Sequence, residues 1–408
     1  MRSPGPRSPL VALLAAAVLT LLPACSSGSG SSDDPDEPGG DGGTAAESPD
    51  ATEPTEEPEP TGSGEPSGSP APAEGDAEVV DTVAENLRAP WGVVRLPDGD
   101  LLVGLRDAGT VQRVPLDGGA VTEAGAVPGV VANGEGGLLG LALSPDATGS
   151  GVQELYAYLT AASDNRIVRL EYDPSRPAGE QLRVTDTVLD GIPKGEVIHN
   201  GGGLGFGPDG MLYAATGDTG DGSLAQREDS LAGKILRMDP RTGEPPSDNP
   251  DPSSLVYTSG HRNVQGLAWD ADGRLWATEF GDDTWDELNL VIRGGNHGWP
   301  EHEGRGGADE GYVDPVEQWS PAEASPSGLA YVRGSLWLAG LRGERLWRVP
   351  LDGAEPVAEP QAFLEGEYGR LRSVLALDDD ELLVVTNETD TRGTPEGGDD
   401  RILRVRVR

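Results

Sequence analysis

Cysteine is almost absent from this chain of 408 residues, which contains only Cys25. No disulfide can form within the chain, so a folded domain must be held together by packing alone. Long apolar runs are also missing, apart from Leu10–Leu22, which is too short to be read as a membrane span. Basic residues are few, with 30 Lys and Arg against 70 Asp and Glu. A chain this acidic is poorly suited to nucleic acid, and we expect no nucleic-acid partner.

The first 25 residues have the pattern of an export signal. Arg2 and Arg7 precede the apolar run, which ends in Leu22-Pro23-Ala24-Cys25. Residues 1–25 are therefore predicted to be a secretory signal peptide. Its ending resembles a bacterial lipobox, in which the cysteine is acylated and becomes the mature N-terminus. We expect an extracytoplasmic protein that is lipid-anchored to the cell membrane through Cys25; a cleaved signal with an incidental cysteine is the alternative.

Residues 26–78 have no Lys or Arg, fifteen acidic residues and almost no large apolar side chains. Such a segment cannot bury enough surface to offset the loss of chain entropy. We predict a disordered, self-repelling tether. Residues 79–408 keep 55 acidic and 28 basic residues, since the signal holds the other two arginines. This part is predicted to be the folded domain.

A repeated unit runs through residues 79–408. Each copy has a β-rich segment, a turn that is often Pro-Asp or Asp-Gly, and further β-rich segments, with helical periodicity hard to find. Six copies follow one another at a spacing of roughly 40 to 60 residues, which is typical of propeller blades. The six stretches are Trp91–Gly118, Gly137–Pro174, Glu196–Pro240, Val264–Gly295, Ser327–Gly353 and Leu371–Arg408. We predict an all-β fold, a six-bladed β-propeller.

Polar residues recur at the start of these units. Equivalent positions in different blades are related by rotation about the central channel, so their side chains should meet at one end of it. The residues concerned are Arg88, Glu135, His199, Arg262, Arg370 and Arg372. A site made of a histidine, a carboxylate and several arginines is implied. The two longest loops, Thr219–Leu231 and His297–Trp319, are expected to add ligands or to cover the site.

Other patterns point to structure rather than to a site. The glycine runs match neither GxGxxG nor a Walker motif, and no helix follows them, so they are interpreted as turns. The segment Asp218–Gly222 lacks the spacing of an EF-hand. Tryptophans within the strands are expected to pack between blades.

Several motifs together carry a resemblance to a known family. They are HNGGGLGFGPDGMLYAATGD, LAGKILRMDPRTG, YTSGHRNVQGLAW, TEFGDDTWDELNLV and GGNHGWP, in this order. They resemble the pyrroloquinoline quinone (PQQ)-dependent soluble aldose sugar dehydrogenases, the glucose/sorbosone dehydrogenase family, from about Leu87 to Val407. The resemblance implies a six-bladed propeller that binds PQQ and calcium at the mouth of its channel. It also implies oxidation of the anomeric hydroxyl of an aldose sugar to a lactone, with electrons passed to an external acceptor.

The resemblance assigns roles to several residues. His199 matches the general base that takes the sugar hydroxyl proton while hydride passes to PQQ, and Asp218 matches the aspartate that orients it. A neutral imidazole suits this task near pH 7, and a carboxylate partner fixes its tautomer. Arg262 and Asn263 match residues that polarise and hold the quinone.

Further cofactor contacts are implied at three arginines and at a metal site. Arg342, Arg370 and Arg372 match cationic positions that face the carboxylates of PQQ, and arginine suits a carboxylate because it can form two parallel hydrogen bonds. The residues that match calcium ligands are Gly281 and Asp282, through backbone carbonyls, and Glu287, for a second, structural calcium.

Glu135 departs from the family pattern. It lies in NGEGGLLG, where better-known relatives have a glutamine that contacts both quinone and substrate. An ionised Glu135 needs calcium or one of Arg262, Arg370 and Arg372 as a partner; a neutral Glu135, the form we favour, donates a hydrogen bond as glutamine does.

Two other functions remain open from the sequence. Six-bladed propellers with one central metal also act as calcium-dependent lactonase-type hydrolases, which need carboxylate and asparagine ligands at the axis. A non-catalytic carbohydrate-binding propeller is the other alternative, because a fold alone does not fix a function.

Overall fold

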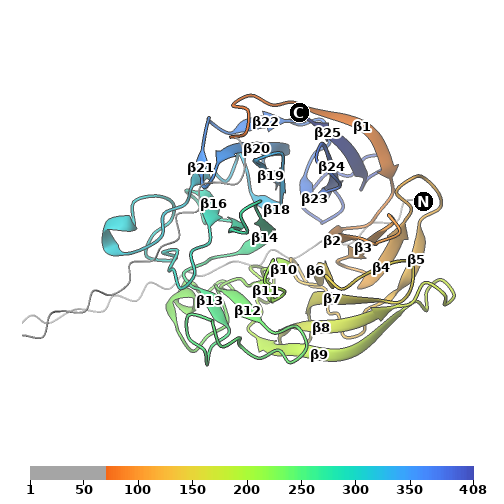
Figure 1. Cartoon of the computed structure of the whole chain (residues 1–408), viewed down its shortest axis with the longest axis horizontal. Coiled ribbons are helices and arrows are strands. Elements are labelled where there is room, and N and C mark those ends of the chain that lie inside the picture. Colours follow the sequence, from red (N-terminus) through yellow and green to blue (C-terminus); the bar gives the residue numbers. More distant parts are fainter. Residues whose placement is uncertain (1–69) are drawn as a thin grey trace, which may run out of the picture. The chain divides into compact units, whose positions relative to one another are not determined.

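Six antiparallel sheets form a closed ring in the part of the chain that the structure describes, residues 70–408 (Figure 1). The structure is a computed structural model. The innermost strands of neighbouring sheets contact one another around the whole ring: β2, β6, β10, β14, β18 and β23. The prediction of an all-β, six-bladed propeller is confirmed.

The first three blades follow the chain in order. Blade 1 contains β2 (Pro90–Arg95), β3 (Leu101–Leu105), β4 (Thr110–Val114) and β5 (Thr122–Ala126). Blade 2 contains β6 (Leu138–Leu143), β7 (Gln153–Thr160), β8 (Asn165–Tyr172) and β9 (Leu182–Ile192). Blade 3 contains β10 (Leu204–Phe206), β11 (Leu212–Ala215), β12 (Ile235–Met238) and β13 (Val256–Thr258).

Blades 4 to 6 complete the ring. Blade 4 contains β14 (Val264–Trp269), β15 (Leu275–Glu279), β16 (Asp286–Leu290) and β17 (Glu317–Trp319). Blade 5 contains β18 (Pro326–Val332), β19 (Ser335–Gly340), β20 (Arg345–Asp352), β21 (Glu355–Pro356) and β22 (Gln361–Phe363). Blade 6 contains β23 (Leu371–Ala376), β24 (Glu381–Thr386), β25 (Ile402–Val407) and β1 (Ala77–Ala84).

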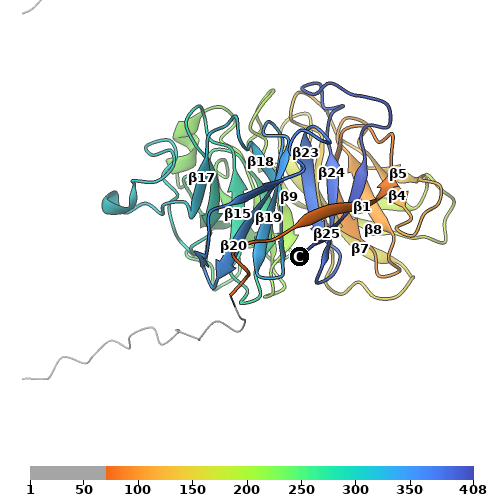
Figure 2. The ribbon, with the colours of Figure 1, turned by 90° about the horizontal axis from the view of Figure 1, so that it is seen from above.

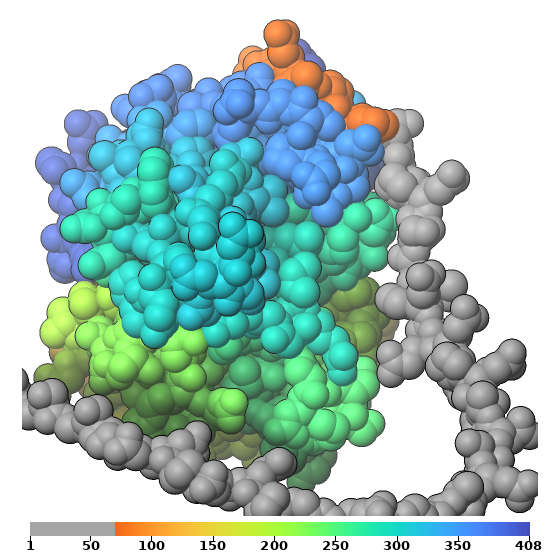
Figure 3. Space-filling view, turned by 90° about the vertical axis from the view of Figure 1, so that its left-hand side faces the viewer, coloured from red at the N-terminus to blue at the C-terminus, as the bar shows by residue number. Residues whose placement is uncertain are grey.

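Helical structure in residues 70–408 is limited to two short 3₁₀ segments, η1 (Gly222–Gln226) and η2 (Ala308–Glu310). The surface loop that carries η2 is cyan in Figure 3, which looks onto blades 4 and 5. No helix of this described region is long and apolar enough to cross a membrane.

The Pro208-Asp209-Gly210 turn shows how the sequence forms a blade. It joins β10 to β11, with Phe206 paired to Leu212. The Asp209 carboxylate accepts a hydrogen bond from the Met211 amide at 3.0 Å, and Gly210 has a φ of 76°, which glycine adopts without strain. Each predicted unit begins at or within one to eight residues of an innermost strand, so these turns mark the true repeat.

The ring closes through β1, which sequence analysis did not anticipate. β1 pairs antiparallel with β25, Ala77 opposite Val407, and so supplies the outer strand of blade 6 (Figure 1). The predicted boundary between residues 78 and 79 is therefore wrong, because it cuts this strand. Residues just before β1 are also held, since Ala71 donates to the Leu351 carbonyl. The predicted signal peptide, and the predicted tether up to residue 69, lie outside the described residues.

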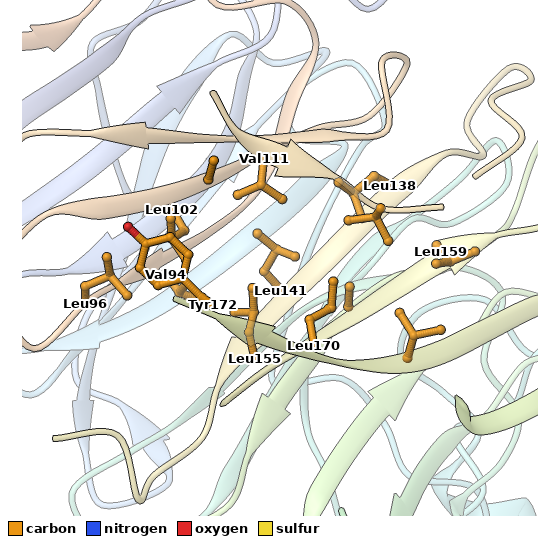
Figure 4. Packing of buried hydrophobic residues seen from close by; sticks show 14 of the residues in the cluster. Val94, Leu96, Leu102, Val111, Leu138, Leu141, Leu155, Leu159, Leu170 and Tyr172 are labelled. Atoms are coloured by element: carbon orange, nitrogen blue, oxygen red, sulfur yellow. The ribbon is translucent and has the colours of Figure 1, made fainter. Parts of the chain in front are cut away.

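Apolar side chains fill the boundaries between blades. Each pair of neighbouring blades encloses one buried cluster of residues. Figure 4 shows the cluster between blades 1 and 2, where Leu102 and Val111 face Leu155 and Leu170. The tryptophans of the strands join such clusters, as predicted; they are Trp269, Trp276, Trp337 and Trp347.

Candidate active site

One end of the ring holds a cavity of about 340 Å³. Every blade contributes to its wall, mainly through loops that precede the innermost strand or follow the second strand. The lining residues with polar or aromatic side chains are Trp91, Arg106, Glu135, His199, Arg262, Gln265, Phe280, Asp282, Asp286, Ser325, Arg342, Arg370, Arg372, Asp390 and Arg392. The sequence predicted this convergence for Glu135, His199, Arg262, Arg370 and Arg372.

Arg88 does not belong to this cavity, and that prediction is wrong. Its neighbour Leu87 packs into the core between blades 1 and 6, where its backbone pairs with Asp400. Arg88 is exposed and lines a different hollow, together with Asp107 and Thr389. Arg106, which follows β3, supplies the arginine of blade 1 instead.

His199 and Asp218 form a buried pair at the cavity wall. His199 Nδ1 lies 2.6 Å from Asp218 Oδ1, and both side chains are buried. The carboxylate also accepts hydrogen bonds from the Gly220 amide at 2.7 Å and from Trp299 Nε1 at 2.8 Å. The structure thus brings together the two side chains that the family resemblance pairs.

The electrostatics of the pair favour an ionised Asp218. Burial, the largest influence, raises the pKa of Asp218, but hydrogen bonds from His199, Gly220 and Trp299 outweigh it, so the net shift of this pKa is downward. An ionised carboxylate can only accept, so His199 Nδ1 must carry the proton. In the neutral imidazole, Nε2 is then left with its lone pair, and no described residue donates to it.

Glu135 holds the backbone of His199. One carboxylate oxygen accepts the His199 amide at 2.9 Å, and the other lies 2.8 Å from Arg392 Nη2. His199 has a φ of 56°, a left-handed conformation that costs a residue with a side chain about 1–3 kcal/mol and persists only when its surroundings enforce it. Both carboxylate oxygens of Glu135 lie beside donors, and the partner Arg392 differs from those expected, which were calcium, Arg262, Arg370 and Arg372. These contacts suit the charged alternative rather than the favoured neutral form, and the charge of Glu135 stays a prediction.

Arg262 lies between the loops of blades 3 and 4. Its guanidinium is 2.6 Å from Asp282 Oδ1 and lies 5.4 Å from the ring centroid of Trp299. Asn263 is fully buried and does not line the cavity. Its Oδ1 accepts the Gly201 amide at 3.0 Å, while its Nδ2 has no partner in the described region. Asn263 therefore supports the glycine run after His199 from below the cavity wall.

Five arginines line the side of the cavity formed by blades 5, 6 and 1: Arg106, Arg342, Arg370, Arg372 and Arg392. Asp390 is the shared carboxylate of two of them, 2.9 Å from Arg370 and 3.5 Å from Arg372. Burial lowers the pKa of Arg372, and the nearby Arg106 and Arg370 lower this pKa further against the effect of Asp390. The cations are thus only partly compensated.

Two of these five arginines have donor groups that are available to a ligand. Arg342 is exposed at the cavity and has no ion pair within residues 70–408. Arg370 Nε is buried and has no hydrogen-bond partner among the described residues. A buried donor without an acceptor, such as Arg370 Nε, destabilises the folded protein unless a ligand accepts a hydrogen bond from it.

Gly281 and Asp282, the expected calcium ligands, lie at the cavity, but Glu287 does not. Asp286 accepts the Gly281 amide at 3.0 Å, and a Cβ on Gly281 would meet the Trp285 carbonyl, so only glycine fits there. The oxygens of Glu287 instead accept from the Gly304 amide at 2.7 Å and from Asn289 at 3.0 Å.

Glu287 lies in a buried acidic setting on the opposite face of β16 from Asp286. Burial, with repulsion from Glu279, raises the pKa of Glu287 to about 8. In residues 70–408 no group of three or more His, Cys, Asp or Glu is arranged to hold a metal. The backbone carbonyls of Gly281 and Asp282 stay the predicted calcium ligands, as the resemblance implies.

Several cavity residues were not found from the sequence. Arg106, Asp286, Asp390 and Arg392 come from stretches whose path depends on the whole ring. The loop His297–Trp319 was expected to add ligands or to cover the site, and it brings Trp299 to Asp218. Its Glu303 also accepts the Asp282 amide at 2.6 Å, which fixes the turn that carries the proposed calcium ligands.

Comparison with known proteins agrees with this geometry. Residues 87–395 match the Glucose / Sorbosone dehydrogenase family. The structure of the PQQ-bound form of aldose sugar dehydrogenase from Streptomyces coelicolor is similar, with 60% sequence identity and a TM-score of 0.80, over 83% of this chain and 100% of that one.

Two curated proteins are also similar. Aldose sugar dehydrogenase YliI of Escherichia coli (strain K12) is 29% identical over 76% of this chain and 90% of its own length. Quinoprotein glucose dehydrogenase B of Acinetobacter calcoaceticus is 32% identical over 53% of this chain and 51% of its own. From the family match and the cavity together, the chain belongs to the glucose/sorbosone dehydrogenase family.

Proposed function

We propose that this protein is a PQQ-dependent oxidoreductase that converts aldose sugars to lactones, with calcium as a second cofactor. The observation that carries the proposal is the meeting, in one cavity, of an oriented histidine and a wall of arginines. The similarity to a PQQ-bound aldose sugar dehydrogenase at 60% identity supports the same cofactor.

The residues of the cavity suit a ligand with several carboxylates. PQQ is a tricarboxylate, and arginine binds carboxylate through paired hydrogen bonds. Arg342 and Arg370 Nε have no partner in the described protein, and Arg372 shares its only carboxylate. An anionic cofactor would compensate these cations and use the free donors.

Calcium would be held on the other side of the cavity. The carbonyl oxygens of Gly281 and Asp282 are ligands of the hard type that calcium prefers. Asp286 and Glu303 fix this turn through its backbone amides, which orients the carbonyl groups. The Arg262 guanidinium, paired with Asp282, lies at the same side.

The chain's own groups account for the movement of the proton. PQQ, when bound, supplies a quinone that accepts a hydride. His199 Nε2 takes the proton of the anomeric hydroxyl, because Asp218 keeps the other ring nitrogen protonated. The sugar thus loses one hydride and one proton, two electrons in all, and becomes a lactone. An external acceptor must later remove the two electrons from the cofactor.

Attachment to a membrane through an acylated Cys25 is part of the proposal. The described chain starts on the side of the ring opposite the cavity. Ala71 lies against Gly334 in the β18–β19 turn, whereas Arg342 of the β19–β20 turn lines the cavity. In the edge-on view, the first described residues leave below β20, and the loop after β24 rises on the opposite side (Figure 2).

Reconstitution of cofactor-free protein tests the proposal. Protein made without PQQ should fold, show no dye-linked turnover with a panel of aldoses, and gain turnover when PQQ and calcium are added together. A chelator should remove that activity, because a calcium ion held by the turn of Gly281 and Asp282 would supply charge stabilisation to the cofactor. Full activity with a nicotinamide cofactor alone, or hydrolysis of lactones without PQQ, would overturn it.

A further inference from the structure

Trp299 contacts both of the groups that the proposed reaction needs most. Its indole N–H donates to Asp218 Oδ2 at 2.8 Å, and the Arg262 guanidinium lies 5.4 Å from its ring centroid. Trp299 is held in this place by its backbone. Its amide donates to the Gly260 carbonyl at 3.0 Å, and its carbonyl accepts from Gln226 at 2.6 Å.

We infer that Trp299 is a positioning residue that holds Asp218, and through it His199, in the arrangement needed for proton abstraction. This inference rests on the proposed function. Three groups donate hydrogen bonds to the Asp218 carboxylate. Oδ1 accepts from His199 Nδ1 and from the Gly220 amide, whereas Oδ2 accepts from Trp299 Nε1 alone. Without Trp299, Oδ2 has no other donor from residues 70–408, and the carboxylate can turn about its bond to Cβ.

The surroundings of Asp218 make its charged form dependent on the donor to Oδ2. Asp218 is 1% exposed, so an unmatched carboxylate oxygen there is not readily hydrated. His199 and the Arg262 backbone lie beside it, and burial together with the charge of Asp218 raises the pKa of the nearby Glu279, whose carboxylate accepts the Arg262 amide, to about 8. Loss of the indole donor therefore favours the protonated form of Asp218, which can no longer keep His199 Nδ1 as the only protonated ring nitrogen.

The same indole face serves Arg262. A guanidinium over an aromatic ring is attracted by the negative face of that ring. Trp299→Phe removes the donor to Asp218 and keeps an aromatic face, whereas Trp299→Leu removes both. The two variants therefore separate the hydrogen bond from the cation–π contact.

Trp347 offers a matched control outside the cavity. Its indole donates to the Glu323 carbonyl at 3.0 Å, and Arg345 lies 5.4 Å from its ring centroid. Trp347→Phe thus also loses an indole hydrogen bond, here to a backbone carbonyl rather than to a carboxylate, and keeps the same kind of ring contact. It should leave turnover and its pH dependence unchanged.

The first measurement needs no cofactor. Nitrogen-15 shifts of the His199 ring in cofactor-free protein, assigned by comparison with His199→Gln, report which nitrogen carries the proton. We expect only the Nδ1–H form in the parent and in Trp347→Phe, and a mixture with the Nε2–H form in Trp299→Phe. If Trp299→Phe, like the parent, showed only the Nδ1–H form, the inference would be overturned. This outcome does not depend on whether the proposed sugar oxidation is correct.

The second measurement is the pH profile of kcat/KM with PQQ, calcium and an active aldose. The proposed base works only as a neutral imidazole beside an ionised Asp218, whose pKa is lowered in the folded protein, so the acidic limb of the profile reports the two groups as one coupled pair. Trp299→Phe should lower kcat about tenfold and move the acidic limb toward higher pH by up to about one unit, the worth of one charge-assisted hydrogen bond. An unchanged profile, or the same change in Trp347→Phe, would contradict a positioning role.

Discussion

Replacement of Glu135 tests how the proposed base is held. Glu135 makes two contacts of different kinds, a hydrogen bond from the His199 amide and an ion pair with Arg392. Glu135→Ala removes both, Glu135→Gln keeps an oxygen that can accept from His199, and Arg392→Gln removes the ion pair alone. The three variants therefore separate the two contacts.

The structure sets the expected magnitudes. The Arg392 side chain is 52% exposed, so solvent screens its ion pair, which is worth at most about 1 kcal/mol, or about fivefold in rate. The His199 side chain is 9% exposed, and its backbone is left-handed. Loss of the acceptor for its amide costs about 1–3 kcal/mol, so Glu135→Ala should lower kcat/KM by about 5- to 150-fold.

Steady-state kinetics of the reconstituted variants, with the PQQ affinity of each, form the assay. Glu135→Gln and Arg392→Gln should each lose no more than about fivefold in kcat/KM, and the double variant should lose no more than either single one, because both remove the same ion pair. If Glu135→Gln were as impaired as Glu135→Ala while Arg392→Gln were normal, the charge of Glu135 would act on cofactor or substrate. Its role in holding His199 would then be refuted.

Four further predictions concern other parts of the molecule. Arg342→Ala should weaken PQQ binding about tenfold or more without lowering the melting temperature of the cofactor-free protein, because Arg342 has no ion pair within residues 70–408; an equal loss of stability would contradict this. Asp218→Asn should bind PQQ but lose turnover by about 10²-fold or more, because the amide no longer fixes the tautomer of His199. Arg348→Met should lower the free energy of unfolding by about 1–3 kcal/mol and leave kcat unchanged, since Arg348 is buried far from the cavity and binds the Pro72 carbonyl at 2.7 Å and Gln361 at 2.6 Å. In a bacterial host the parent should fractionate with membranes, whereas Cys25→Ser should be unacylated; a soluble parent that starts well after Cys25 would contradict the anchor.

The sixfold repeat could be predicted from the sequence because each blade contains short-range turn and strand patterns. Turns such as Pro208-Asp209-Gly210 fix a hairpin through contacts within a few residues, and the innermost strands follow them at regular spacing. The pairing of β1 with β25 joins residues more than 300 positions apart, so no local turn motif predicts it. For the same reason, the end of the predicted tether was placed too late.

Site residues that lie within a family motif could be predicted from the sequence. Residues that reach the cavity from loops of other blades could not. His199 and Asp218 lie in one motif and form the expected pair. Arg392 reaches Glu135 from blade 6, and Trp299 reaches Asp218 from the loop after β16, so both depend on the closed ring. The partner of Glu135 could not be predicted because Arg392 reaches it only in the closed ring.

In the proposed reaction, His199 removes the proton of an aldose bound beside PQQ in this cavity. Single-turnover kinetics under anaerobic conditions test this step, by following the loss of quinone absorbance when a sugar is mixed with PQQ-loaded protein. His199→Ala should bind PQQ within about threefold of the parent, yet its reduction by sugar should be slower by about 10²- to 10⁴-fold, the usual worth of a positioned base. Reduction within threefold of the parent rate would show that another group takes the proton and would contradict the account.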